Sequence, residues 1–256
     1  MLADPVSKAG THPLHAAGAY YCLDFSSVFT ASVLLGLKGI ESVFDLCAAP
    51  GGKSVLAAVF LSPSQLSANE VIGKRTGALI TNLKRCKIPG VVVTRLDPRQ
   101  LATLIPETQQ CVMVDAPCSG QSLPARGSEA PGCFHPVTVK GNAGRQKRIL
   151  AQAAKLVAPG GYLTYMTCTY SLEENEHILL WLLKHFPTFT TQVVPHLTEY
   201  QSKYTELPCY RLWPHQGLGA GGAVFLVRNT VEGAAQPMQP LPTVWEQDDH
   251  VTRRHI

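Results

Sequence analysis

The chain has 256 residues, of which 45% are hydrophobic and 16% charged, a composition typical of a globular protein with a substantial core. No run approaches the ~18 apolar residues of a membrane-spanning helix, and the first residues lack the pattern of a secretion signal, so we expect a cytoplasmic protein without a membrane partner. The formal net charge of +4 permits a nucleic-acid partner without requiring one.

Apolar, β-branched runs alternate with helix-like segments along the chain, which indicates βαβ units and an α/β fold with a mostly parallel sheet. The stretch "APGG" at 158–161 is a stop signal for the helix before it. We expect strands at 42–47, 65–70, 91–96, 111–116, 161–168, 189–194 and 223–229, and helices at 53–61, 74–86, 145–157 and 172–185.

The pattern divides the chain into an amino-terminal segment, residues 1–40, a folded domain, residues 41–229, and a tail of uncertain order, residues 230–256. Within the domain, residues 119–144 are rich in Gly and Pro and weakly periodic, and a loop of that length in a compact domain is typically functional or mobile.

The eight cysteines are widely spread, without Cys-x-x-Cys or paired Cys/His spacing. This predicts neither a disulfide framework nor a structural metal, and most of these thiols are expected to be small buried side chains in a reducing compartment. That interpretation applies to Cys22, Cys86, Cys111, Cys133 and Cys209.

The stretch "DLCAAPGGKS", residues 45–54, joins the first strand to the first helix of the domain. Its Gly-Lys-Ser ending is that of a phosphate-binding loop, but Cys47 stands where that motif has its first glycine, and the dinucleotide fingerprint G-x-G-x-x-G is absent. What remains is a small-residue turn at a helix N-terminus, which permits close backbone approach and favours a ligand carboxylate.

Acidic residues follow the next two strands. Glu70 is placed to accept hydrogen bonds from both hydroxyls of a ribose, and Asp97 is placed to accept one from an adenine amino group. Together with a loop for a carboxylate, they describe a site for S-adenosylmethionine. The alternative is that both residues only cap the helices that follow.

Two further cysteines end neighbouring strands of the expected sheet: Cys118 in "VMVDAPCSG" and Cys168 in "YMTCTYS". Strands about 4.8 Å apart would bring both thiols to one crevice. Methylation of a pyrimidine at carbon-5 requires such a thiol, because carbon-5 is a poor nucleophile until a thiolate adds at carbon-6. Asp115 is placed to assist at N3 of the ring, and a second group is needed to promote release.

The stretches "DLCAAPGGK" (45–53), "DAPCSG" (115–120) and "GGYLTYMTCTYSLEENE" (160–176) resemble the Nol1/Nop2/Sun family of RNA (cytosine-5) methyltransferases, and the resemblance extends over residues 18–228. It implies a Rossmann-like class I S-adenosylmethionine-dependent methyltransferase, with a mostly parallel seven-stranded sheet and helices on both faces. It also implies methyl transfer to a cytosine of RNA, ribosomal RNA in preference to transfer RNA.

The resemblance also implies roles for individual residues. Cys168 resembles the nucleophile that forms the adduct with carbon-6, and Cys118 the thiol that assists product release. Asp115 resembles the carboxylate that meets both the cofactor and the target base, with Lys53 orienting it. Glu70 and Asp97 would bind ribose and adenine, and the cofactor loop would comprise Cys47, Ala48, Ala49, Pro50, Gly51, Gly52 and Lys53.

The sequence departs from the family at Leu23, where Gln is usual, and at Thr169, where Ser is common. Little precedes the expected core, so we expect RNA to be recognised by the core itself, by the loop 119–144 or within a ribonucleoprotein. We expect the protein to be a monomer and not to bind DNA. The candidate phosphate contacts are Lys84, Arg85, Lys87, Arg126, Arg145, Lys147 and Arg148; the alternative is that they form solvated helix faces. The candidate base-stacking side chains are Tyr210, Arg211 and Trp213; the alternative is that they pack within the protein.

Two other classes of function are compatible with parts of this pattern. One is a non-catalytic RNA-binding or ribosome-assembly factor that retains the methyltransferase fold, although the central motifs are intact. The other is a nucleoside triphosphatase, against which the missing first glycine of the phosphate loop argues.

Overall fold

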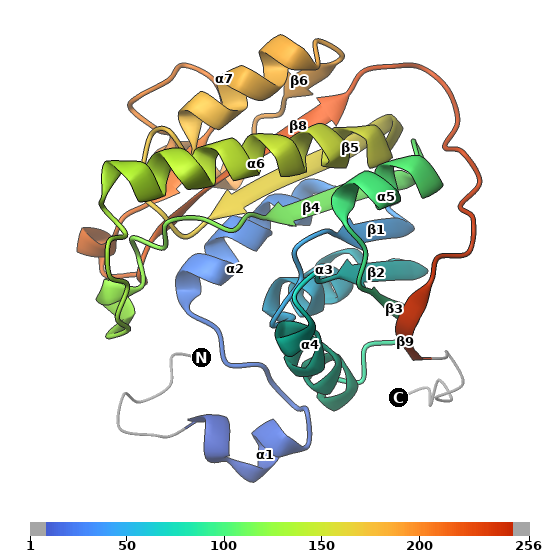
Figure 1. Cartoon of the computed structure of the whole chain (residues 1–256). Helices are drawn as coiled ribbons and strands as arrows, with labels where there is room; N and C mark the ends of the chain where they lie inside the picture. Colours follow the sequence, from blue (N-terminus) through green and yellow to red (C-terminus); the bar gives the residue numbers. More distant parts are fainter. Residues whose placement is uncertain (1–8, 248–256) are drawn as a thin grey trace.

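The computed structural model describes residues 9–247, which form one sheet with helices on both faces (Figure 1). The predictions that concern residues 1–8 and 248–256 lie outside the described residues. The strand order is β6-β8-β5-β4-β1-β2-β3-β9, with β7 beside β8. The strands are β1 (Ser42–Asp45), β2 (Gln65–Asn69), β3 (Val91–Thr94), β4 (Gln109–Asp115), β5 (Val157–Thr167), β6 (Phe189–Thr191), β7 (Tyr210–Leu212), β8 (Gly222–Asn229) and β9 (Thr243–Gln247).

The helices alternate with the parallel strands, so that each crossover returns the chain to the same edge of the sheet. The α-helices are α1 (Pro13–Ala16), α2 (Phe25–Ala31), α3 (Gly52–Leu61), α4 (Gly73–Arg85), α5 (Pro98–Leu104), α6 (Pro136–Leu156) and α7 (Glu176–His185). The short 3-10 helices are η1 (Ala9–Thr11), η2 (Ser32–Gly36), η3 (Pro124–Arg126), η4 (Pro195–Tyr200) and η5 (Pro214–Gln216).

The expected α/β class is confirmed: β3, β2, β1, β4 and β5 are parallel, and β6 to β9 pair antiparallel to their neighbours. The described residues contain nine strands rather than the seven expected. The two additional strands are β7, which is only three residues long, and β9, which lies within the expected tail. Both are too short or too exposed to produce a clear alternation of apolar and polar residues.

The strands bury side chains on both faces of the sheet. Successive residues point to opposite faces, so Val43 of β1 packs with α3 and α4 whereas Phe44 packs with α5 and α6. In β4, Met113 lies on the first face and Val112 and Val114 on the second. This double burial explains why the strands read as continuous apolar runs in the sequence.

Helix α6 is longer than the sequence indicated. It begins at Pro136 instead of residue 145, because His135 accepts a hydrogen bond from the backbone N–H of Val137 as an N-cap and Pro136 occupies the first turn. Gly141 and Gly144 obscured the helical pattern there. The loop before α6 is correspondingly shorter than 119–144. At the other end "APGG" does end the helix, but it does so as the first part of β5.

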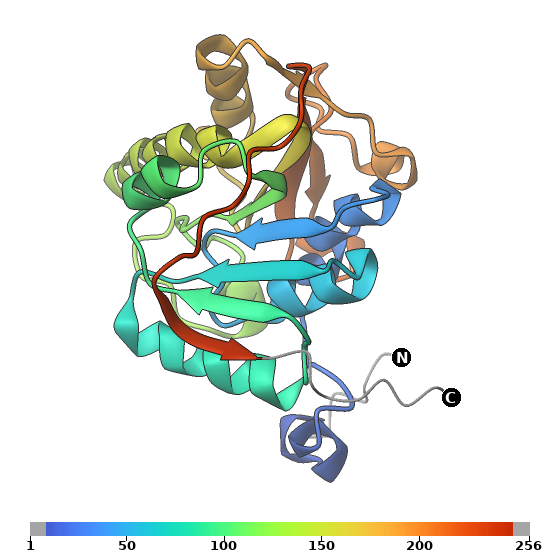
Figure 2. The same ribbon diagram turned by 90° about the vertical axis from the view of Figure 1, so that its right-hand side faces the viewer.

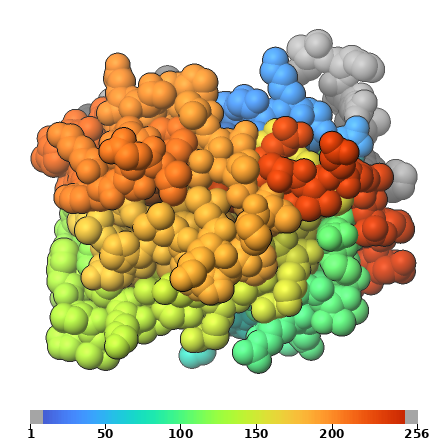
Figure 3. Space-filling model, turned by 90° about the horizontal axis from the view of Figure 1, so that it is seen from above, coloured from blue at the N-terminus to red at the C-terminus, as the bar shows by residue number. Residues whose placement is uncertain are grey.

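The segment after β8 returns along the outside of the molecule (Figure 3). The backbone N–H of Gln236 donates to the carbonyl of Glu107, and Leu241 is buried against the core. The segment then adds β9 antiparallel to β3 at the edge of the sheet (Figure 2). Within residues 9–247, no helix combines the length and apolar character needed to cross a membrane.

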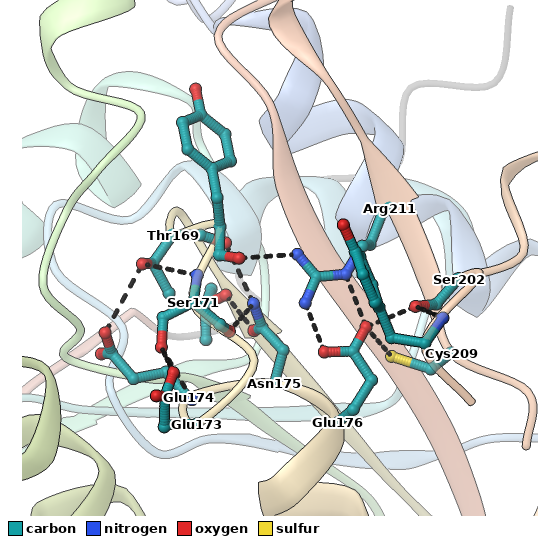
Figure 4. Close-up of polar contacts among 12 residues, drawn as sticks. Thr169, Ser171, Glu173, Glu174, Asn175, Glu176, Ser202, Cys209 and Arg211 are labelled. Atoms are coloured by element: carbon teal, nitrogen blue, oxygen red, sulfur yellow. Dashed lines mark hydrogen bonds and ion pairs between the residues drawn. The ribbon is translucent and has the colours of Figure 1, made fainter. Parts of the chain in front are cut away.

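A buried ion pair connects α7 to β7 (Figure 4). Glu176 and Arg211 have side chains only 2% and 3% exposed, and the guanidinium of Arg211 contacts the carboxylate through two nitrogens. Ser202 donates to the same carboxylate, and Arg211 Nη1 donates to the carbonyl of Tyr170 at 3.0 Å. The pair therefore fixes the backbone two residues after Cys168.

We expect the substitution Glu176→Ala to lower the free energy of unfolding by about 3–5 kcal/mol, because it leaves the Arg211 charge buried without a partner. The double variant Glu176→Leu/Arg211→Met should lose less of its free energy of unfolding than Glu176→Ala, because it removes both charges. Urea denaturation measures both, with the exposed Lys184→Met as the control variant. An equal loss in the single and double variants would contradict this interpretation.

Candidate active site

The first strand ends in a turn that requires glycine. Gly51 has a φ of 109°, and it precedes α3. A Cβ atom at Gly52 would lie 2.6 Å from Leu23 Cδ2, so any side chain at residue 52 would displace Leu23. Leu23, which departs from the family pattern, thus packs directly against the turn that follows β1.

Asp45 lies beneath this turn and was not singled out from the sequence. It is completely buried, and Ser54 Oγ of α3 donates to its Oδ2 at 2.7 Å. Burial raises the pKa of Asp45 to about 7. Its Oδ1 atom has no hydrogen-bond partner among the described residues.

A cavity of about 410 Å³ opens at the carboxyl ends of β1, β2 and β3. Its acidic side chains are Glu70 and Asp97, and apolar contacts come from Ile72, Pro98 and Pro117. Two carboxyl acceptors and an apolar slot fit a nucleoside with a ribose and an adenine. Sequence reasoning missed Arg75, Arg99 and Gln152 as lining residues, because nothing in their spacing pointed to the cavity.

Both acidic residues also perform the local role that was the alternative interpretation. Asp97 accepts from the backbone N–H of Arg99 and forms a capping box with Gln100 at the start of α5. Glu70 accepts from the backbone N–H of Ile72 at 2.9 Å and pairs with Arg75 at 3.1 Å. Each carboxyl oxygen can accept more than one hydrogen bond, so capping leaves capacity for a ligand.

The side chain of Lys53, from α3, meets that of Asp115, the last residue of β4. Lys53 Nζ lies 2.7 Å from Asp115 Oδ2, and the side chains are 14% and 31% exposed. The ion pair therefore fixes a carboxylate that remains partly exposed.

Cys118 and Cys168 lie in contact, with their sulfur atoms 3.3 Å apart. The contact arises because β4 and β5 pair in parallel, with Asp115 opposite Met166. Backbone and side-chain hydrogen bonds then connect the two loops: Ser122 N donates to the carbonyl of Cys168, and Gln121 Oε1 accepts from Tyr170 N.

The pKa values of the two thiols are shifted in opposite directions. A hydrogen bond from Cys118 lowers the pKa of Cys168 to about 7, and the charges of Lys53 and Arg126 act in the same direction, against burial and Asp115. The same hydrogen bond and burial raise the pKa of Cys118 well above its usual value. Of the two thiols, Cys168 is therefore the one that ionises more readily.

Cys47 differs from Cys168 although it lies at the same edge of the sheet. Burial and the nearby carboxyl groups of Asp45, Asp115 and Glu70 raise the pKa of Cys47. Its thiol is consequently unreactive, in keeping with a place in a binding loop.

The candidate RNA-contacting residues are dispersed. Arg85 donates to the carbonyls of His15 and Tyr20, and Lys84 lies over the Trp245 ring. The candidate residues of α6 line two different cavities: Arg145 and Arg148 line the one at the ends of β1, β2 and β3, and Lys147 lines another.

Arg126, in the loop before α6, is anchored to the amino-terminal segment. It donates to Ser26 Oγ and pairs with Asp24 at 3.5 Å. Because its charge lowers the pKa of Cys168, Arg126 belongs to the surroundings of the thiols.

The three candidate stacking residues pack within the protein. Tyr210 and Arg211 are 1% and 3% exposed, which supports the packing alternative for both. Trp213 is half-buried and stacks on Tyr170, with ring centroids 5.4 Å apart.

A parallel β3-β2-β1-β4-β5 sheet that closes with an antiparallel β8 is the fold of the class I, S-adenosylmethionine-dependent methyltransferases. The chain belongs to the 16S rRNA methyltransferase RsmB/F family, whose model matches residues 32–225. The Sun-family resemblance found in the motifs is thereby confirmed.

Individual relatives agree with this assignment. The chain is 32% identical to the ribosomal RNA small subunit methyltransferase F of Serratia proteamaculans, over 70% of this chain and 38% of that protein. The structure of NSun6 from Pyrococcus horikoshii is 24% identical and has a TM-score of 0.78, over 89% of this chain and 57% of that one. A methyltransferase homolog protein from Pyrococcus horikoshii is 25% identical with a TM-score of 0.72, over 88% and 73%. The chain spans about two fifths of the length of the curated relatives it matches.

We expect alkylation of Cys168 by iodoacetamide to rise with pH through a midpoint near 7, because a thiol reacts as its thiolate and this pKa is lowered to about 7. In Cys118→Ala the midpoint should move upward, since the hydrogen bond that lowers the pKa is lost. Mass spectrometry of the peptides measures the rate, with the exposed Cys22 as an internal reference. A midpoint that does not move in Cys118→Ala would contradict the assignment.

Proposed function

We propose that this chain carries the catalytic part of an S-adenosylmethionine-dependent RNA (cytosine-5) methyltransferase that acts on ribosomal RNA in the cytoplasm. The observation that carries the proposal is the contact between Cys118 and a Cys168 of lowered pKa, beside the Lys53–Asp115 ion pair. A methyltransferase that modifies a nitrogen or a ribose oxygen has no use for such a pair of thiols.

In the proposed mechanism, the Cys168 thiolate adds to carbon-6 of the cytosine. Asp115, oriented by Lys53, binds the ring at N3 and stabilises the electron density that moves into it. Carbon-5 then becomes nucleophilic and accepts the methyl group. After a base removes the carbon-5 proton, the Cys168–carbon-6 bond breaks and the ring regains its double bond. Cys118 assists this release.

The cofactor would supply an electrophilic methyl group on a sulfonium sulfur. The residues that would hold it are the turn from Cys47 to Lys53, with Glu70 at the ribose and Asp97 at the adenine, and Asp115 between cofactor and base. The fit of the cavity to a nucleoside supports this placement.

Ribosomal RNA as substrate rests on relatives that are named for it. A cytosine in a folded RNA would have to leave its stack to reach Cys168. We propose that a monomer binds the RNA through the surface around Arg126 and the loop before α6.

The variant Cys168→Ala should lose methyl transfer, because no nucleophile remains for carbon-6. Cys118→Ala should instead accumulate a covalent complex with RNA, because addition proceeds but release is slowed. Denaturing electrophoresis with labelled RNA distinguishes the two. Full activity in Cys168→Ala would refute the nucleophile assignment.

The variant Glu70→Gln should bind S-adenosylmethionine at least about tenfold more weakly, because hydrogen bonds from the ribose to a carboxylate are worth about 1.5–3 kcal/mol. Calorimetry measures the affinity, with the exposed Glu107→Gln as the control. If the unmodified chain bound no S-adenosylmethionine, the non-catalytic factor would be the better interpretation, and binding of ATP in its place would favour the nucleoside triphosphatase.

Bisulfite mapping of ribosomal and transfer RNA, with and without the gene, tests the substrate. We expect one or more ribosomal cytosines to lose methylation when the gene is absent. A loss of methylation confined to transfer RNA would show that transfer RNA, and not ribosomal RNA, is the substrate. No loss in either RNA would refute the proposed activity.

A further inference from the structure

The backbone on both sides of Cys118 is held by two buried side chains. Gln146 of α6 donates from Nε2 to the carbonyl of Pro117 at 3.0 Å, and Glu174 accepts at Oε2 from the N–H of Ser119 at 2.9 Å. The same Gln146 nitrogen donates to Glu174 Oε2 at 2.8 Å. Both side chains are inaccessible to solvent. One continuous chain of hydrogen bonds therefore encloses the peptide that carries Cys118.

Glu174 also reaches the segment that carries Cys168. Its Oε1 lies 3.5 Å from Thr169 Oγ1 (Figure 4), and Thr169 shares a 2.7 Å hydroxyl contact with Ser119. The Tyr165 hydroxyl donates to the Glu174 carbonyl and so anchors this residue to β5. A single carboxyl group is thus connected to the residue after each cysteine.

We infer that Gln146 and Glu174 are positioning residues that hold the Cys118 sulfur against the Cys168 sulfur. A buried polar group costs free energy unless it is hydrogen-bonded, and an apolar pair of similar volume would fill the same space without that cost. The Gln146 Oε1 atom has no hydrogen-bond partner among the described residues, although its nitrogen makes two bonds. Gln146 therefore contributes as a donor to Pro117 in the Cys118 loop and to Glu174, which itself holds Ser119 of that loop.

The function of this clamp follows from what the sulfur contact does. A hydrogen bond between sulfur atoms 3.3 Å apart weakens quickly with distance, and it is the largest influence that lowers the pKa of Cys168. A clamp that keeps Cys118 in place thereby maintains the thiolate of Cys168 near neutral pH. Its importance for methyl transfer rests on the proposed function, whereas its effect on the thiol does not.

The test is the pH profile of iodoacetamide alkylation at Cys168 in the full chain, without RNA or cofactor. In Glu174→Ala and in Gln146→Met, the rate at pH 7 should fall about fivefold for the first unit by which the pKa rises above 7, and about tenfold for each further unit. At a pH high enough to ionise the thiol in every variant, the rates should converge. A general loss of structure would not produce this convergence.

The matched control is Gln109→Met, which replaces another buried glutamine, at the opposite end of β4. Its profile should equal that of the unmodified chain. Glu174→Gln, which keeps an acceptor oxygen for Ser119, should restore most of the rate at pH 7. If Glu174→Ala does not fold, the profile of Gln146→Met tests the inference, because this variant removes only a neutral hydrogen-bond donor and leaves no buried charge without a partner.

An unchanged profile in a folded Gln146→Met or Glu174→Ala variant would overturn the inference. If methylation proves to be absent from the unmodified chain, the proposed function fails, yet the alkylation profiles still decide whether the clamp exists. If methylation is present, the variants should lower kcat at pH 7 and leave KM for RNA unchanged, and this loss should diminish as pH rises.

Discussion

The parallel pairing of β4 with β5 is the constraint on which the rest of the site depends. Because Asp115 lies opposite Met166, the loops that follow the two strands leave the sheet at the same level, and Cys118 meets Cys168 without any long-range rearrangement. A shift of one residue in this register would turn each side chain to the other face. The continuous apolar core on both faces of these strands opposes such a shift, so the packing of the sheet determines the chemistry at its edge.

Below this edge the protein buries three carboxyl groups, although burying a carboxyl group costs free energy. Asp45, Glu174 and Glu176 are at most 2% exposed, and each accepts hydrogen bonds from a different element: α3, the Cys118 loop and β7. Since satisfying a buried carboxyl group demands defined geometry, these residues fix the directions in which the loops leave the sheet. Their contribution is to the shape of the site more than to net stability.

The parts of the structure that the sequence predicted are those with a local pattern. The parallel strands appear as apolar runs, and the turn after β1 is recognised by its glycines. The sequence therefore predicted the edge of the sheet at which the candidate site lies. The proximity of Cys118 to Cys168 followed from strand order. By contrast, the start of α6, the strand β9 and the partners of Arg211 depend on contacts between distant segments. Gln146 and Glu174 belong to that second group: a glutamine inside a helix carries no signal until the helix is placed across the loop.

Glu70 and Asp97 show why two interpretations of one residue need not exclude each other. Each caps the backbone after its strand, and each also lines the cavity at the end of that strand. The two roles are compatible because each carboxyl oxygen can accept more than one hydrogen bond, so the cap, and in Glu70 also the ion pair with Arg75, leaves further acceptor capacity. A residue already fixed by its cap loses less conformational freedom when a ligand binds, so capping would favour the binding that we propose for these two carboxyl groups. Asp115 is fixed in a similar way by Lys53, and its side chain remains 31% exposed.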